Sequence, residues 1–242
     1  MLRPDRCEIA KELYWGRGRR PKPEDNFAIE LFGTLARHSE VMLDIGAYTG
    51  IFTLAGTAVN PDLRAHAFEI VPDVYRLLFD NCVRNGVLHR VTLHHTGVGK
   101  PDALMMVPAE SDDSALPSYY SSRLHFEDGI LVRFRSLDSL VGLVPTGSRV
   151  VVKLDVEGTE NDVLTYGQDF LAAFHPEVVC EVLADVADTA KLEALLRPHG
   201  YRFYLVRQAD LRLAARIEPD VHFRDWFFTT RDAAELNVVS SG

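Results

Sequence analysis

Short, continuous apolar runs alternate along the chain with segments whose apolar residues recur at helical spacing. The apolar runs are typical of strands buried on both faces of a parallel sheet. They occupy residues 41–45, 65–69, 91–98, 149–156 and 177–183. Helices are expected at residues 25–37, 50–59, 72–85, 163–174 and 188–199. Strands that alternate with helices in this order predict a mostly parallel α/β sheet covered by helices.

Two regions break this alternation. Between residues 100 and 141, a short strand at 103–109, a polar loop at 110–120 and another strand at 130–135 replace the expected helix. Insertions into a regular fold often carry specificity, so we expect substrate contacts in this region. Near the end, strands at 201–207 and 225–230 are joined by a long connection, which predicts an antiparallel hairpin on the sheet.

The length and composition suit one domain. A chain of 242 residues with 47% hydrophobic content can bury a sizeable core. We expect a single catalytic domain at residues 41–242, preceded by an N-terminal helical extension at residues 1–40. The aromatic residues Tyr14 and Trp15 in this extension either pack against the domain or form a lid over the substrate.

Charge and cysteine usage exclude several classes of protein. The formal net charge of −9 disfavours nucleic acid as the main partner, and we interpret the one basic cluster, residues 17–22, as a solvated loop. Three scattered cysteines neither form a disulfide framework nor a zinc site, and Cys180 is expected to be a buried thiol. No secretion signal and no membrane-spanning run is seen, so we expect a cytoplasmic protein without a membrane partner, and a homo-oligomer stays open.

The most informative stretch lies where the first predicted strand ends. Its sequence is Asp44-Ile45-Gly46-Ala47-Tyr48-Thr49-Gly50. A strand that ends in glycines and feeds a helix either makes only a tight turn or binds a nucleotide-like ligand. Tyr48 stands where a dinucleotide fingerprint needs its second glycine, which argues against a pyrophosphate. An acid beside the turn suits a ligand with an ammonium group and no phosphate, such as S-adenosylmethionine.

A second acid follows at the end of the next strand. Glu69 closes the run 65–69, and an acid at the tip of the second strand of a βαβ unit accepts hydrogen bonds from ribose hydroxyls. A third group of acids belongs to later strands. Asp155 and Glu157 follow the run 149–154, and Glu181 lies near the end of the next strand. These side chains are expected at one edge of the sheet.

Five segments together resemble the FkbM family of S-adenosylmethionine-dependent methyltransferases. They are residues 44–50, 67–72, 135–140, 153–160 and 176–181, and the most distinctive is Lys153-Leu154-Asp155-Val156-Glu157-Gly158-Thr159-Glu160. The resemblance implies a class I methyltransferase fold, which is a Rossmann-like three-layer α/β sandwich. Its mostly parallel seven-stranded sheet has an antiparallel last strand. The implied activity is O-methylation of a hydroxyl on a small-molecule natural product or a sugar.

The resemblance also suggests how the cofactor is held. The methionine portion would lie against Asp44 and the turn formed by Gly46, Ala47, Tyr48, Thr49 and Gly50. Glu69, with Ile70 beside it, would hold the ribose, and Gly97 and Val98 would border the adenine. Two positions depart from the family pattern, which commonly has asparagine in place of Tyr48 and proline in place of Ile70.

One of Asp155, Glu157 and Glu181 is expected to be the general base, because a base must reach the acceptor hydroxyl. Asp155, which would also border the cofactor, is the first choice. The alternative is structural, with Glu157 only accepting hydrogen bonds from the backbone around Gly158. Three carboxylates could also bind Mg²⁺, but we do not favour a metal and assign no metal ligand.

Two other functions stay open at this point. A nicotinamide-dependent oxidoreductase would use the same βαβ core, although the missing Gly-x-Gly argues against NAD. A non-catalytic protein that binds S-adenosylmethionine would keep the pocket without methyl transfer. The identity of the acceptor is not encoded in any of these motifs.

Overall fold

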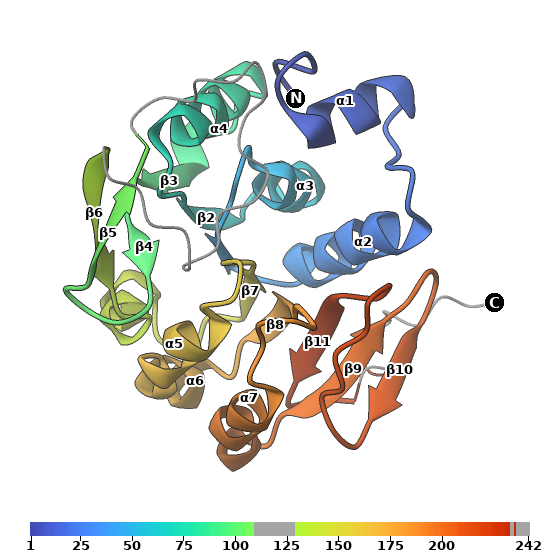
Figure 1. Ribbon diagram of the computed structural model, residues 1–242, viewed down its shortest axis with the longest axis vertical. Coiled ribbons are helices and arrows are strands. Elements are labelled where there is room, and N and C mark those ends of the chain that lie inside the picture. Colours follow the sequence, from blue (N-terminus) through green and yellow to red (C-terminus); the bar gives the residue numbers. More distant parts are fainter. Residues whose placement is uncertain (109–128, 233–234, 236–242) are drawn as a thin grey trace.

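The computed structural model describes residues 1–108, 129–232 and 235. Its centre is an eight-stranded sheet with the strand order β10-β9-β11-β8-β7-β1-β2-β3 (Figure 1). The bounds are β1 Val41–Ile45, β2 Arg64–Phe68, β3 Val91–His94, β7 Val150–Leu154, β8 Glu177–Glu181, β9 Arg202–Val206, β10 Leu211–Ala214 and β11 Asp225–Thr229.

The direction of the strands confirms the expected fold class. Strands β3, β2, β1, β7 and β8 pair in parallel, whereas β11 pairs antiparallel with both β8 and β9. This is the mostly parallel sheet of a class I methyltransferase, with its reversed strand inserted between two others. The sequence predicted seven strands in this sheet. The eighth, β10, lies in the connection between the last two expected strands and pairs antiparallel with β9.

Helices cover both faces of the sheet. One layer contains α2 Pro23–Arg37, α3 Ile51–Val59 and α4 Pro72–Arg84, and the other contains η2 Asp138–Leu143, α5 Glu160–Thr165, α6 Gln168–Phe174 and α7 Thr189–Leu196. Successive strand residues point to opposite faces, so Val41 and Leu43 pack toward one layer and Met42 toward the other. Two short helices, η1 Leu88–Arg90 and η3 Arg197–His199, follow α4 and α7.

The first helix, α1 Glu8–Trp15, joins the domain near the end of β1. Cys7 and Ala10 pack against Val74 and neighbouring residues of α4. The Cys7 Sγ lies 3.3 Å from the Thr49 Oγ1, so the segment is fixed to the turn after β1. At the far end of α1, Tyr14 and Trp15 are 66% and 75% exposed and contact each other edge to face.

One predicted strand is divided between the main sheet and a small second sheet. The run 91–98 was expected to be continuous, but it divides into β3 and β4 Gly97–Val98. Strand β4 pairs with β6 Ile130–Arg135, which pairs in turn with β5 Leu104–Val107. The Thr96 hydroxyl donates to the Arg133 carbonyl at 2.6 Å, which directs the chain away from the main sheet. The polar loop expected at 110–120 lies outside the described residues.

A predicted single helix at 163–174 is also divided, into α5 and α6. The break falls at Gly167, where a Cβ atom would lie 2.6 Å from the Leu137 Cδ2. The Asp138 carboxylate then accepts from the Phe170 N–H at 2.9 Å and satisfies the start of α6. At the start of α5, the Thr159 side chain does not cap the helix, since its hydroxyl donates to the Val156 carbonyl instead.

Among the described residues, we find no helix with the length and apolar character needed to span a bilayer.

Candidate active site

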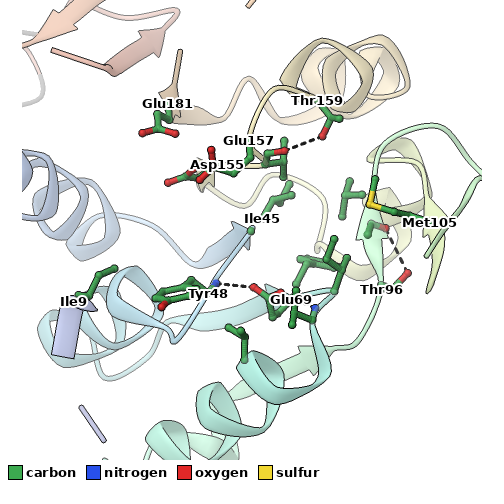
Figure 2. Close-up of a pocket in the computed structure, with 18 of the residues that line it drawn as sticks. Ile9, Ile45, Tyr48, Glu69, Thr96, Met105, Asp155, Glu157, Thr159 and Glu181 are labelled. Atoms are coloured by element: carbon green, nitrogen blue, oxygen red, sulfur yellow. Dashed lines mark hydrogen bonds between the residues drawn. The ribbon is translucent and has the colours of Figure 1, made fainter. Parts of the chain in front are cut away.

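A cleft of about 470 Å³ lies at the carboxyl ends of β1, β2, β7 and β8 (Figure 2). Of the residues predicted to bind a cofactor or to act on the substrate, nine contribute to its wall. They are Gly46, Tyr48, Glu69, Ile70, Gly97, Val98, Asp155, Glu157 and Glu181. Residues from five separate segments therefore meet in one place, as expected for the carboxyl edge of a parallel sheet.

The turn after β1 brings two of the motifs into direct contact. Gly46 has φ +82°, and a Cβ atom there would lie 1.7 Å from the backbone oxygen of Asp155. The Asp155 N–H also donates to the Ile45 carbonyl at 3.0 Å. Only glycine allows so close an approach, so this residue fixes the distance between the two sides of the cleft.

Tyr48 adopts an unusual backbone conformation for a bulky residue, with φ +50°. Its N–H donates to the Glu69 Oε2 at 2.9 Å, which helps hold this left-handed conformation. Its ring packs with Cys7 and Val74 beneath α1. Asparagine, which the resemblance leads us to expect here, adopts positive φ more readily. In this chain, packing and a hydrogen bond offset the local strain.

Glu69 organises the second wall of the cleft. One carboxylate oxygen accepts from the Tyr48 N–H, and the other accepts from the Val71 N–H at 2.8 Å. The residue is 7% exposed. Burial raises the pKa of Glu69 to about 7, and the two backbone hydrogen bonds oppose this shift only in part. The carboxylate remains within the cleft wall, where it retains lone pairs for a ligand.

This raised pKa predicts that stability falls with rising pH. The Glu69 carboxyl binds a proton more tightly in the folded protein, where its pKa is about 7, than in the unfolded chain, where its pKa is the usual 4.5. The stabilisation that protonated Glu69 adds to the free energy of unfolding is therefore fully present below about pH 4.5 and is lost as the pH rises through about 7. Glu69→Gln should reduce the difference in unfolding free energy between about pH 5 and pH 8 by about 2.5 kcal/mol. Urea unfolding at both pH values measures this difference.

The matched control for this prediction is Glu218→Gln, which makes the same chemical change at an exposed position. This variant should keep the pH dependence of the wild type. An unchanged pH dependence in Glu69→Gln would contradict the assignment of the effect to Glu69.

Four of the predicted cofactor residues lie behind the wall. Ala47 and Thr49 are buried, and Gly50, at φ +91°, packs against Leu78 before α3 begins. Asp44 is placed differently from the expectation. It is 1% exposed, and its Oδ2 accepts from the N–H and the hydroxyl of Thr53 at 2.9 and 2.5 Å.

The Asp44 side chain therefore lies outside the wall of the cleft, and its contact with a ligand stays a prediction. The side chain projects to the face of the sheet covered by α3 and satisfies a donor in the first turn of that helix. Burial raises the pKa of Asp44 to about 6. Its second oxygen has no hydrogen-bond partner within the described structure. Its role is to support the turn rather than to form the wall.

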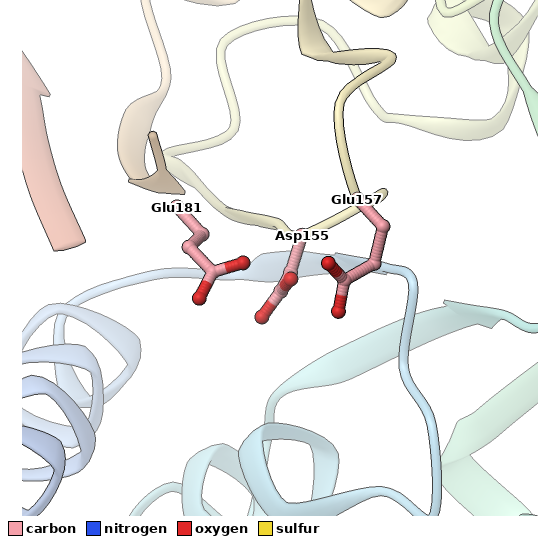
Figure 3. Close-up of side chains that lie close together, drawn as sticks. All are labelled: Asp155, Glu157 and Glu181. Atoms are coloured by element: carbon pink, nitrogen blue, oxygen red, sulfur yellow. The ribbon is translucent and has the colours of Figure 1, made fainter. Parts of the chain in front are cut away.

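The three predicted acids converge. Asp155, Glu157 and Glu181 each place a carboxylate oxygen within 4.8 Å of the others (Figure 3). Burial and the charge of Asp155 raise the pKa of Glu157 to about 7, and the same two causes hold the pKa of Glu181 well above its usual range. The cluster is thus able to accept or share protons near neutral pH, and its oxygens could also hold a divalent cation.

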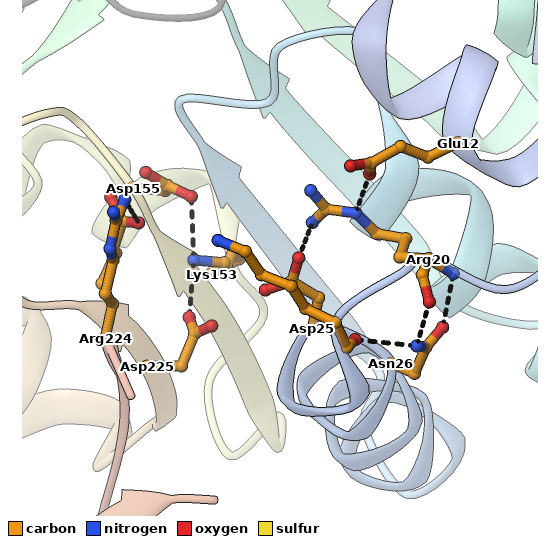
Figure 4. Close-up of polar contacts among 10 residues, drawn as sticks. Glu12, Arg20, Asp25, Asn26, Lys153, Asp155, Arg224 and Asp225 are labelled. Atoms are coloured by element: carbon orange, nitrogen blue, oxygen red, sulfur yellow. Dashed lines mark hydrogen bonds and ion pairs between the residues drawn. The ribbon is translucent and has the colours of Figure 1, made fainter. Parts of the chain in front are cut away.

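Lys153 supplies the compensating charge. It is 1% exposed and lies within β7, and its Nζ is 3.1 Å from the Asp155 Oδ2 and 3.3 Å from the Asp225 Oδ1 (Figure 4). Burial alone would lower the pKa of Lys153, but the charges of Asp155 and Asp225 raise it above its usual value. A buried ammonium between two carboxylates orients Asp155 toward the cleft.

The opposite end of the cleft is formed by the second sheet. Thr96, Gly97 and Val98 border it, with Met105 of β5 and Phe134 of β6 behind them. A Cβ atom at Gly97 would lie 2.5 Å from the Phe134 ring, so the glycine lets the ring approach. This end is largely apolar, as a planar base requires.

Several wall residues were missed by sequence reasoning. Ile9 of α1 belongs to a segment without a recognisable motif, whereas Met105 lies in the region 100–141 where substrate contacts were expected. Arg20 and Lys22 lie in the basic cluster that the sequence led us to treat as a solvated loop, and Arg224 lies just before β11. The density of positive charge in residues 17–22 was the available signal for two of these residues.

Comparisons with known proteins agree with this geometry. Residues 44–203 match the family model described as "Methyltransferase FkbM domain". The 31-O-demethyl-FK506 methyltransferase FkbM of Streptomyces tacrolimicus is 28% identical over 199 residues, which cover 70% of this chain and 75% of that protein. Methyltransferase 1 of Beauveria bassiana is 28% identical over 202 residues, with 75% and 74% covered.

Solved structures of low sequence identity are also similar. The precorrin-6y C5,15-methyltransferase of Geobacter metallireducens aligns with a TM-score of 0.44 at 15% identity, covering 82% of this chain and 86% of that chain. The family match spans more than half of the chain, and it includes the turn after β1, Glu69 and all three acids of the cleft. The chain therefore belongs to the FkbM family of S-adenosylmethionine-dependent methyltransferases.

Proposed function

We propose that this protein transfers the methyl group of S-adenosylmethionine to a hydroxyl group of a small-molecule acceptor, with Asp155 as the proton acceptor. The position of Asp155 carries this proposal. Its carboxylate belongs to the wall of the main cleft and also to the wall of a smaller cavity of about 140 Å³ beside it. A residue shared by two adjoining cavities can contact both a cofactor in one and an acceptor in the other.

The donor would occupy the main cleft. Its ribose hydroxyls would donate to Glu69, whose carboxylate is already fixed by two backbone N–H groups. Its methionine portion would lie along the turn at Gly46 and Tyr48, and its adenine would lie among the residues near β4, bordered by Met105. In this arrangement the methyl group faces the acids that follow β7 and β8.

The chemistry requires positioning and removal of one proton. The acceptor oxygen attacks the methyl carbon in line with the breaking carbon–sulfur bond, whose electron pair remains on sulfur. The hydroxyl proton passes to the Asp155 carboxylate. Holding the reacting atoms about 3–3.5 Å apart supplies much of the rate enhancement, and a placed base adds about 10²–10⁴-fold.

The remaining charged groups support Asp155 in this scheme. Lys153 is a positioning residue, because its ammonium fixes one Asp155 oxygen without lining the main cleft. Glu157 has φ +55°, which turns its side chain back toward Asp155. We favour proton transfer over a bound divalent cation, since the Lys153 ammonium already occupies one Asp155 oxygen. Unchanged activity in the presence of a chelator would support proton transfer and exclude an essential divalent cation.

O-methylation is favoured over methylation of nitrogen or carbon on two grounds. A hydroxyl nucleophile benefits from a carboxylate base at the methyl group, which this cleft provides. The name of the Streptomyces tacrolimicus relative denotes a methyltransferase that acts at an oxygen of a natural product. Both observations support a hydroxylated small molecule as the acceptor.

The class of cofactor is tested by ligand-induced stabilisation. S-adenosylmethionine and S-adenosylhomocysteine at about 100 times their Kd should each stabilise the fold by about 2.7 kcal/mol. For a domain of this size, that free energy raises the Tm by about 5–10 °C. NAD is the control ligand and should leave the Tm unchanged. Stabilisation by NAD alone would overturn the proposal in favour of an oxidoreductase.

A non-catalytic binding protein would pass that test, so methyl transfer needs its own readout. Incubation with methyl-labelled S-adenosylmethionine and a hydroxylated metabolite extract should transfer label to a small molecule. Binding of the donor without any transfer would instead support a binding protein.

A further inference from the structure

The smaller cavity beside the acid cluster has a wall of unusual composition. Of the residues that form it, only Ala28, Phe52 and Val206 are apolar, and the others are charged or polar. A flat aromatic acceptor or an acyl chain binds in apolar surroundings. This cavity therefore suits a small, polar molecule.

The cavity adjoins the main cleft. Five residues belong to both walls, namely Arg20, Lys22, Asp155, Glu181 and Arg224. Two of these residues carry the carboxylates next to which the methyl group would lie, and the other three are cationic. An acceptor in the smaller cavity would thus meet both acids and cations, which are interspersed along the wall (Figure 4).

Most charges around the cavity already have partners. The Arg20 guanidinium pairs with Glu12 at 2.7 Å and with Asp25 at 3.1 Å. The Lys153 ammonium is held between Asp155 and Asp225. Each of these two cations thus faces two carboxylates, so neither is left to attract an anionic ligand.

Two cations of the shared wall, Lys22 and Arg224, are exposed, and within the described residues neither has a carboxylate partner closer than 3.9 Å. Within the part of the chain that the structure describes, no carboxylate lies within 4.0 Å of the Lys22 ammonium. The only ion pair found there for Arg224 joins its Nη1 to the Glu181 Oε1, at 3.9 Å. Glu24, the other acid at this wall, lies in the first turn of α2. An anion bound at Lys22 and Arg224 would replace the water around these two exposed cations.

We propose that the acceptor carries an anionic group, a carboxylate or a phosphate, that binds at Lys22 and Arg224 while its hydroxyl lies at Asp155. The inference rests on the proposed function, because it assigns the smaller cavity to the acceptor. It also gives the basic cluster at residues 17–22 a role that a solvated loop would not have. Charge-assisted hydrogen bonds from Lys and Arg to such anions are strong enough to select an acceptor.

Three sugars that share one ring test the proposal. Glucose, glucuronate and glucose 6-phosphate are titrated into the protein loaded with S-adenosylhomocysteine, and binding is measured by calorimetry. At least one anionic sugar should bind about ten-fold or more tightly than glucose, and high salt should weaken this preference. The anionic sugar that binds more tightly shows whether the site prefers a carboxylate or a phosphate.

Variants test whether Lys22 and Arg224 cause the preference for anionic sugars. Lys22→Gln combined with Arg224→Gln should abolish the preference for the anionic sugars. The matched control is Arg17→Gln, which removes the same charge from the same loop but lies outside both cavities, and it should keep the preference. Equal binding of all three sugars, or an undiminished preference in the double variant, would overturn the proposal.

The cofactor step keeps the two hypotheses apart. Failure of the wild type to bind S-adenosylhomocysteine would count against the proposed function itself. Normal binding of S-adenosylhomocysteine with no preference for anionic sugars would reject only the anionic acceptor.

Discussion

Asp155→Asn should lower the turnover number by about 10²–10⁴-fold while changing the affinity for S-adenosylmethionine little. Asparagine keeps the size of the side chain, but its amide cannot take a proton from the acceptor hydroxyl. The methyl donor would still be held by the turn at Gly46 and by Glu69, neither of which depends on this carboxylate for its conformation. Single-turnover kinetics with a labelled methyl group, together with calorimetric titration of the donor, separates the two effects.

Asp225→Asn is the matched control, because it removes the other carboxylate that pairs with Lys153. Asp225 lies outside the wall of the main cleft. Its variant should share any loss of stability that comes from the broken ion pair, with a much smaller loss of turnover, about ten-fold at most. Full activity in Asp155→Asn would remove Asp155 as the base and leave Glu157 or Glu181 for that role.

Gly46→Ala should lower the free energy of unfolding by about 3 kcal/mol or more and weaken binding of S-adenosylmethionine. The added methyl group meets the backbone oxygen of Asp155, and alanine is also strained at φ +82°. Neither atom belongs to a flexible side chain, so β1 and β7 must move apart at the cleft. Thermal unfolding would show a Tm lower by about 6–12 °C.

Gly142→Ala provides the control, because a Cβ atom there has nothing within 4 Å. This exposed position should tolerate alanine with no more than a small change in Tm. If Gly46→Ala unfolded and bound the donor like the wild type, the close contact between the two motif segments would not govern the cleft.

The sequence was sufficient to predict the frame of the site. Acids that follow separate apolar runs must meet at one edge if the strands are parallel, and Asp155, Glu157 and Glu181 do so. The same logic placed Glu69 opposite them. Such predictions succeed because strand direction and the alternation of side chains determine which residues reach the edge.

Side-chain direction within a motif was harder to predict. Asp44 follows the family pattern, yet its carboxylate satisfies Thr53 instead of facing the cleft. The pattern of residue types is the same for both uses, since an acid near a helix start can cap the helix or bind a ligand. Only the packing of α3 against β1 decides between them.

Long-range placement of irregular segments was also beyond the sequence. The basic cluster contains no periodicity that links it to the acids more than a hundred residues later. It reaches the site because α1 is fixed to the turn after β1 by Cys7 and because Arg20 pairs with α1 and α2 together. Tertiary contacts of this kind have no local signature.

The eighth strand protects the protein from association through its sheet edge. Without β10, the edge would be β9, in which four consecutive residues are buried and whose backbone would offer unpaired N–H and C=O groups to another chain. Strand β10 covers that edge with only four residues and carries the charged side chain of Arg212. Short, charged edge strands are poor templates for pairing. The added strand therefore favours solubility of the folded chain at high concentration.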